Sequence, residues 1–365
     1  MKVEIISREQ IKPSSPTPSH DRSYKLSLFD QISPPFYFPP ILFYFPEETN
    51  MAKQSELSST LKRSLSDALT LFYPLAGRME GEKARLESHI SDFIERPRTE
   101  ELNQLIPLDL TVQVSFFTCG GMVIGICISH GIADGCTLST FVEAWAACAR
   151  GDPHVVCPSF ISASLFPPRE PLGFNPTAPI PEQGLVIKRL VFSVSSMAAL
   201  KARVSPVQPT RVEIVTALIW KCVIGQHRTI STAFHPVNMK RRMVPAIPDH
   251  IFGNLFLMTD AVNEGEVDLA ALAAKIGGAI RGIEGDYARQ RQGEKGFDVL
   301  MRNLDRIVQV VSKGEVQVFR FSSWCGFPIY EANFGAWASH TVFLMDTRCL
   351  GGVEAWMINF EGKAE

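Results

Sequence analysis

The sequence lacks the motifs that mark several common classes of active site. Eight cysteines in 365 residues are too few for a disulfide framework, and their spacing does not suit zinc. No H-E-x-x-H motif indicates a metal, and no G-x-S-x-G elbow offers a serine nucleophile. No glycine-rich phosphate loop indicates a bound nucleotide. We interpret the cysteines as free thiols in a reducing compartment.

An excess of charge and long apolar runs are also lacking. Basic and acidic residues nearly balance, for a net charge of −2, which argues against a surface built to follow nucleic acid or an anionic membrane. No run reaches the roughly 18 apolar residues that span a bilayer, and the first residues hold no signal-peptide core. We therefore expect a cytosolic protein that binds neither nucleic acid nor membrane.

What the chain does contain is enough apolar material, 45% of its residues, for one or two sizeable cores. Helical and strand-like patterns mix in both halves: leucines recur on one face of residues 57–71, and Met122–Ile128 is a strand-length apolar run. Alternation also predicts a strand at residues 24–30. The pattern predicts an α/β or α+β protein with domains at 1–165 and 186–365, joined by a proline-rich crossover at 166–185.

The most informative segment is SHGIADG, residues 129–135. The apolar run delivers His130 at its end, Asp134 follows four residues later, and the small residues between them permit a sharp turn. A neutral imidazole is suited to accept a proton near pH 7. A surface histidine beside a turn aspartate gives the same pattern. If the motif is catalytic, a histidine base without a protein nucleophile suits attack by an alcohol or amine on an activated acyl donor.

Several landmarks together resemble the BAHD acyltransferases, plant enzymes that acylate alcohols and amines from acyl-CoA thioesters. The segment from His130 to Gly135 matches their H-x-x-x-D-G signature. Other matching segments follow the family order: LSLFDQ (26–31), FYPLAGR (72–78), VNMKRRM (237–243), Gly253-Asn254 and SSWCGFPIYEANFG (322–335). The similarity covers nearly the whole chain and is strongest to the alkaloid O-acetyltransferases.

The resemblance implies two chloramphenicol-acetyltransferase-like α/β domains with a solvent channel between them. It implies that His130 takes the proton of the acceptor hydroxyl during attack on the thioester and returns it to the coenzyme A sulfur. Acetyl-CoA would be the co-substrate, with no bound cofactor or metal. The acceptor would be a small alcohol or amine, such as a hydroxyl of a plant alkaloid, and the enzyme a monomer.

Further site residues follow from the resemblance. Gly135, Ser322 and Trp324 would contact the substrate and coenzyme A, and the Trp324 indole N–H would stabilise the oxyanion. Asp134 would have an orienting role, pairing with Lys240, which stands where the family has arginine. Arg242 lies in the same basic run.

The second family signature, D-F-G-W-G, is altered. Its first three positions are Asn333, Phe334 and Gly335, followed by Ala336 and Trp337, so the carboxylate is lost and the tryptophan displaced. Segments that relatives carry after Arg78, after His340 and at the end are missing. These departures support an alternative, a catalytically impaired paralogue that binds a small molecule. A condensation domain of peptide assembly is a third, weaker interpretation, because Ser129 stands where such domains have a second histidine.

Overall fold

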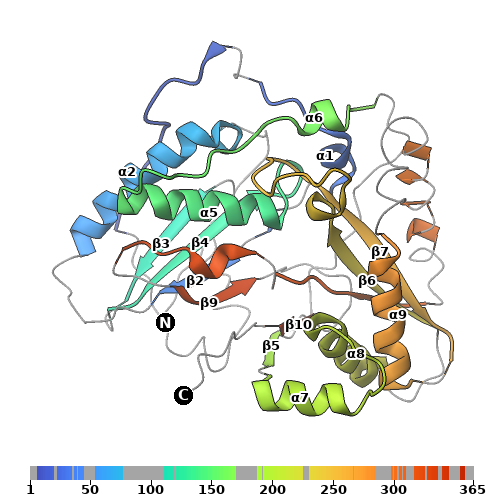
Figure 1. The fold of residues 1–365 in the computed structure, drawn as a ribbon. Coiled ribbons are helices and arrows are strands. Elements are labelled where there is room, and N and C mark those ends of the chain that lie inside the picture. Colours follow the sequence, from blue (N-terminus) through green and yellow to red (C-terminus); the bar gives the residue numbers. More distant parts are fainter. Residues whose placement is uncertain are drawn as a thin grey trace. The chain divides into compact units, whose positions relative to one another are not determined.

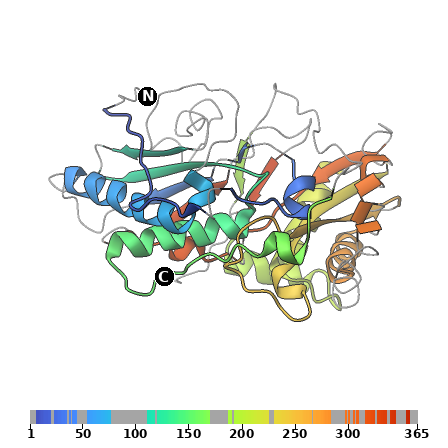
Figure 2. The ribbon, with the colours of Figure 1, turned by 90° about the horizontal axis from the view of Figure 1, so that it is seen from above.

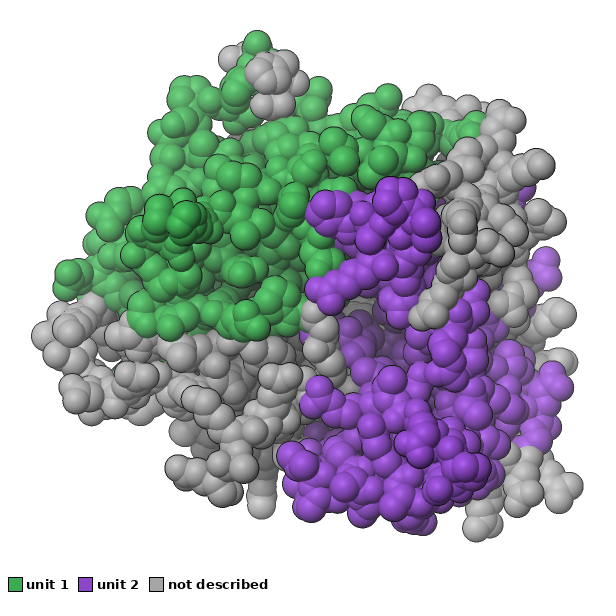
Figure 3. Space-filling view, in the orientation of Figure 1, with its two compact units in different colours: residues 1–188, 249–254, 327–350 green, residues 189–248, 255–326, 351–365 purple. Residues whose placement is uncertain are grey.

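The computed structural model divides into two compact units, coloured separately in Figure 3. The first comprises Met1–Lys188, Asp249–Asn254 and Phe327–Leu350, and the second comprises Arg189–Pro248, Leu255–Gly326 and Gly351–Glu365. The structure describes residues 6–19, 23–34, 37–38, 40–44, 54–76, 111–117, 120–169, 187–190, 192–224, 230–265, 267–283, 297–298, 300–301, 304–305, 307–309, 316–324, 327–335, 339–344 and 354–357.

The first unit is built on a five-stranded sheet (Figure 1). Its strands are β1 (Tyr37–Phe38), β2 (Pro40–Tyr44), β3 (Thr111–Phe116), β4 (Met122–Ser129) and β9 (Ser339–Leu344). β3 pairs antiparallel with one edge of β4, while β1 and β2 follow each other in one register along the other edge. β9 pairs antiparallel with β2. β4 is buried along its whole length, as expected of an apolar run covered on both faces.

Helices α2 (Gln54–Leu71) and α5 (Gly135–Arg150) lie side by side over this sheet (Figures 1 and 2). The buried Trp145 indole joins them, because its Nε1–H donates to the Leu61 carbonyl oxygen at 3.2 Å and to Ser64 Oγ at 3.1 Å. Four short helices complete the described part of the unit: α1 (Leu28–Ile32), η3 (Tyr73–Ala76), α6 (Ser162–Leu165) and η5 (Pro328–Glu331).

The strand predicted at residues 24–30 is wrong, because this segment runs into the short helix α1. Ser27 is the N-cap: its Oγ accepts the Asp30 N–H, and the Asp30 carboxylate accepts the Ser27 N–H. This reciprocal pair is a capping box, which stabilises a helix start. The alternating apolar residues favoured a strand, although the Ser27–Asp30 capping box starts a helix. The Asp30 carboxyl is buried inside the first unit.

The second unit contains a three-stranded sheet with β6 in the middle. β6 pairs antiparallel with β7 and parallel with β8, and two further strands, β5 and β10, form a separate pair. β5 (Ile187–Leu190) crosses the boundary between the units, which falls after Lys188. The other described elements of this unit are α7 (Val194–Ala202), α8 (Arg211–Ile224), β6 (Ser231–Asn238), η4 (Lys240–Arg242), β7 (Phe256–Asn263), α9 (Leu269–Arg281), β8 (Gln317–Arg320) and β10 (Glu354–Met357).

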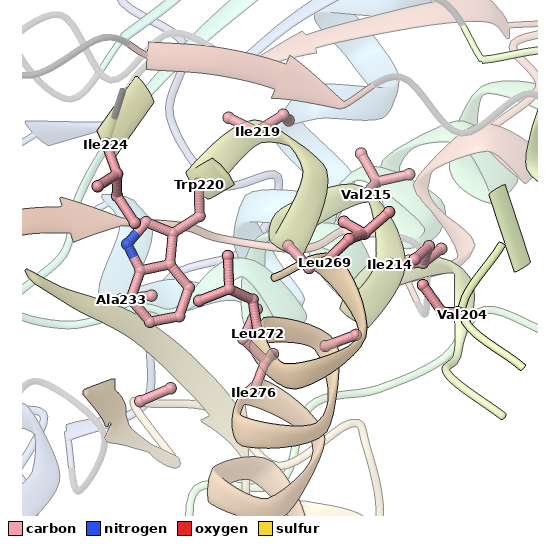
Figure 4. Packing of buried hydrophobic residues seen from close by; sticks show 13 residues of the cluster. Val204, Ile214, Val215, Ile219, Trp220, Ile224, Ala233, Leu269, Leu272 and Ile276 are labelled. Atoms are coloured by element: carbon pink, nitrogen blue, oxygen red, sulfur yellow. The ribbon is translucent and has the colours of Figure 1, made fainter. Parts of the chain in front are cut away.

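The core of the second unit lies between α8, α9 and the sheet. Figure 4 shows Trp220 of α8 facing Leu272 and Ile276 of α9, beside Ala233 of β6. Thr210 and Glu213 form a capping box at the start of α8, which accounts for that helix boundary. Within the described ranges, no helix has the length and apolar character needed to cross a membrane.

Candidate active site

His130 lies at the junction between β4 and α5. It follows the last residue of the buried strand, and its side chain is half-buried. The chain turns at once, since the Ile132 N–H donates to the Ser129 carbonyl oxygen at 3.2 Å. The Phe38 ring of β1 lies against the imidazole, with the ring centroids 5.0 Å apart. The sheet therefore holds a partly exposed histidine in a mainly apolar setting.

The imidazole contacts Asn254, a residue 124 positions away in the sequence. His130 Nδ1 lies 3.1 Å from Asn254 Oδ1, and Asn254 Nδ2 donates to the His130 carbonyl oxygen at 2.7 Å. Both residues belong to the first unit, because residues 249–254 return to it from the second half of the sequence. The amide thus binds both the ring and the main chain of the histidine.

Asp30 fixes the orientation of the Asn254 amide. Its Oδ1 accepts the Asn254 main-chain N–H at 2.8 Å and Nδ2–H at 2.9 Å. Its Oδ2 accepts the Ser27 N–H, the Ser27 hydroxyl and, at 3.3 Å, the Tyr24 hydroxyl. Burial raises the pKa of the Asp30 carboxyl, and the hydrogen bonds from Asn254 and Ser27 oppose that rise.

This arrangement selects one form of the neutral imidazole. Asn254 Nδ2 is occupied by Asp30 and by the His130 carbonyl oxygen, so Oδ1 is the atom that faces the ring. An amide oxygen only accepts, and its partner His130 Nδ1 must carry a hydrogen. The lone pair is then on Nε2, and this nitrogen can remove a proton from a neighbouring group.

Asp134 caps α5. Its Oδ1 accepts the Thr137 N–H at 2.8 Å, and its backbone is extended, as at a helix N-cap. Gly135 is the first residue of the helix. Lys240, which we expect to pair with Asp134, and Arg242 form part of η4 in the second unit, and Lys240 is fully buried. The pairing with Asp134 stays a prediction.

The altered second signature packs within the first unit. Phe334 is buried edge-on between Trp145 and Tyr44, with ring centroids 4.9 Å and 5.6 Å away. The Asn333 carbonyl oxygen accepts a hydrogen bond from Arg150 at the end of α5. Gly335 has φ +86°, a backbone conformation that favours glycine. The signature therefore holds the far end of the helix that begins beside His130.

The remaining expected site residues belong to the second unit or lie outside the described residues. Ser322 and Trp324 follow β8 in the second unit, Ser322 being exposed and Trp324 half-buried. Ala336, Trp337 and the part of the chain around Arg78 lie outside the described residues. Within the first unit the structure brings His130 together with Asn254 and Asp30, while the roles of Ser322 and Trp324 stay predictions. The sequence contained the Ser27–Asp30 capping box and the Gly253-Asn254 landmark, but we gave neither a role.

Comparisons with known proteins identify the family. Residues 1–348 match the model of the Transferase family. The chain is 33% identical over 409 residues to stemmadenine O-acetyltransferase of Catharanthus roseus, covering 97% of this chain and 93% of that one. It is 34% identical over 431 residues to epi-neemfruitin B 7-O-acetyltransferase of Melia azedarach, covering 99% and 95%. The chain belongs to the BAHD acyltransferases.

Solved structures agree with this assignment. The crystal structure of vinorine synthase matches with a TM-score of 0.76 at 28% identity, covering 93% of this chain and 88% of that one. Fusarium sporotrichioides TRI101, solved with coenzyme A and T-2, matches with a TM-score of 0.57 at 16% identity, covering 88% of each chain, and shows the fold alone. The expected two-domain α/β fold and the acyltransferase class are confirmed.

Proposed function

We propose that this protein transfers an acetyl group from acetyl-CoA to a hydroxyl of a plant specialised metabolite, with His130 as general base. The observation that carries the proposal is the Nδ1 contact with Asn254, which supports a lone pair on Nε2 of a partly exposed imidazole. Named relatives that acetylate an alkaloid or a limonoid support the acetyl donor and this class of acceptor. Following the family resemblance, we place the enzyme in the cytosol as a monomer.

The proposed reaction has two steps. His130 Nε2 removes the acceptor hydroxyl proton while the oxygen forms a bond to the thioester carbonyl carbon. The tetrahedral intermediate then breaks its carbon–sulfur bond, and His130 returns the proton to the departing sulfur. Asn254 Oδ1 accepts the Nδ1–H throughout and stabilises the imidazolium that forms between the steps. No covalent acyl-enzyme is required.

The oxyanion needs a hydrogen-bond donor while the tetrahedral intermediate exists. We assign this role to the Trp324 indole N–H, with Ser322 and Gly135 at the coenzyme A and acceptor sites. The assignment rests on the family resemblance. Trp324→Phe, which keeps an aromatic ring but loses the N–H donor, should lower kcat with a small change in KM.

Release of free coenzyme A tests the function directly. Purified protein is mixed with acetyl-CoA and a panel of alcohols, including indole alkaloid and limonoid alcohols, and thiol release is followed. We expect alcohol-dependent release that His130→Ala lowers by about a thousandfold or more, as for loss of a general base. His154→Ala, at an exposed histidine, is the matched control. Equal rates for His130→Ala and wild type would refute the base assignment.

The alternative is a protein that binds a small molecule without turnover. Asn333 favours it, because the signature carboxylate is absent and, among the described residues, the Asn333 Oδ1 atom has no hydrogen-bond partner. This alternative predicts ligand-dependent thermal stabilisation with no release of coenzyme A from any donor. Robust turnover with one alcohol rules it out.

A further inference from the structure

The turn that carries Asn254 is held by side chains from three other parts of the first unit. Ser162 Oγ donates to the Phe252 carbonyl oxygen, and Thr137 Oγ1 donates to the Gly253 carbonyl oxygen at 2.9 Å. The Asn254 N–H donates to Asp30 Oδ1 at 2.8 Å. One main-chain group in each of three consecutive residues therefore has a side-chain partner.

The turn has little freedom to relax. Gly253 has φ +112°, and a Cβ at this position would lie 2.8 Å from Tyr24 Oη and 3.0 Å from Ser162 Oγ. Since Asn254 follows directly, a rotation of the Gly253 peptide would move the amide that contacts His130. A hydrogen bond to the Gly253 carbonyl oxygen therefore also helps to hold the Asn254 side-chain amide in place.

Thr137 joins this turn to the histidine loop. Its N–H binds Asp134 Oδ1 at 2.8 Å and its hydroxyl binds the Gly253 carbonyl oxygen, and its side chain is buried. One residue in the first turn of α5 thus contacts both segments that flank the imidazole. Buried polar groups with satisfied partners make such junctions rigid.

We propose that Thr137 is a positioning residue for the histidine base. Its hydroxyl holds the Gly253 peptide, the peptide holds the Asn254 side chain, and Asn254 selects the His130 form with the lone pair on Nε2. This inference rests on the proposed function for its kinetic test. The structural part of the inference, that Thr137 controls which ring nitrogen of His130 carries the hydrogen, does not depend on the proposed function.

Thr137→Val tests the role because valine keeps the shape and loses only the hydroxyl. The Gly253 carbonyl oxygen would lose this donor, and displacement of Asn254 by a fraction of an ångström should lower kcat by about tenfold to hundredfold. KM for acetyl-CoA should change by less than about twofold, because uniform binding is not affected. Thr137→Ser, which keeps the hydroxyl, should restore kcat to within about threefold of wild type.

Thr140→Val is the matched control. Thr140 is also a buried threonine of α5, but its hydroxyl donates to the Cys136 carbonyl oxygen within the same helix. Its loss should leave kcat unchanged. A similar loss of kcat in both variants would mean that any buried α5 hydroxyl matters, and would overturn the inference.

Nitrogen-15 NMR of the His130 ring gives a readout independent of turnover. We expect Thr137→Val to increase the population with hydrogen on Nε2, and Thr137→Ser to match wild type. Unchanged ring resonances and unchanged kcat in Thr137→Val would overturn the inference. If Thr137→Val does not fold, Thr137→Ala replaces it. If wild type transfers no acyl group, the proposed function fails, while the ring resonances still decide the role of Thr137.

Discussion

His235 should make the stability of the second unit depend on pH. It lies on β6, where its ring stacks on Phe321 at an interplanar angle of 13° and a centroid distance of 5.4 Å. Its Nε2 is buried and has no hydrogen-bond partner among the described residues. Burial lowers the pKa of His235 from its usual 6.5 to about 4.

The sign and size of the effect follow from this depressed pKa. Between about pH 6.5 and pH 4 the unfolded chain binds a proton at this residue that the folded chain does not. The free energy of unfolding is therefore unaffected by His235 above pH 6.5 and falls as the pH drops towards 4. For one such group, linkage gives a loss of about 2 kcal/mol between pH 7 and pH 5.

His235→Leu replaces the titrating imidazole with an apolar side chain of similar size. Urea unfolding at pH 7 and pH 5 should show a pH-dependent loss about 2 kcal/mol smaller in the variant than in wild type. Amide hydrogen exchange of β6 and β7 assigns the change to the second unit. His154→Leu, at an exposed histidine, should behave as wild type. Equal pH dependence in wild type and His235→Leu would refute the reasoning.

Substitutions at three further positions test the first unit. Gly253→Ala places a Cβ against Tyr24 Oη on strained backbone, and coenzyme A release should slow by about tenfold or more. Asp134→Ala removes the α5 cap and should lower the free energy of urea unfolding by about 1 kcal/mol, whereas Asp134→Asn keeps an acceptor and should change it little. Asp30→Asn supplies a donor as well as an acceptor to Asn254, so nitrogen-15 NMR should show more His130 with hydrogen on Nε2.

Elements with strong local signals could be predicted from the sequence. The leucine face of residues 57–71 corresponds to α2, and the apolar run at 122–128 to β4, because each pattern matches one regular structure buried on the expected faces. The prediction of a strand at residues 24–30 was wrong for a reason that is also local. The alternation of this segment suggested a strand, but the Ser27–Asp30 cap stabilises a helix start.

The candidate active site could be predicted from the sequence only where its residues are close together along the chain. His130 and Asp134 lie in one loop, so their spacing in the sequence was sufficient to predict that they are close together. Asn254 is 124 residues from His130, and Asp30 is 224 residues from Asn254. No pattern within a short window predicts these contacts, because they depend on the return of residues 249–254 to the first unit. The family landmarks marked the position of Asn254 without indicating its partner.

The Asn254 side-chain amide lies between Asp30 and His130, and it determines which His130 nitrogen carries the hydrogen in a way that a direct carboxylate contact would not. A carboxylate has two equivalent acceptors, whereas the amide has distinct ends, and Asp30 binds the donor end of Asn254. The buried Asp30 carboxyl therefore orients the Asn254 amide and makes no described hydrogen bond to the imidazole. The donors on Asn254 and Ser27 also oppose the rise in the pKa of Asp30 caused by burial. Loss of the hydrogen bond from Asn254 or from Ser27 should favour protonated Asp30. Protonated Asp30 should in turn hold the Asn254 side-chain amide less firmly. We therefore expect the proton position on the His130 ring to depend on the ionisation of Asp30.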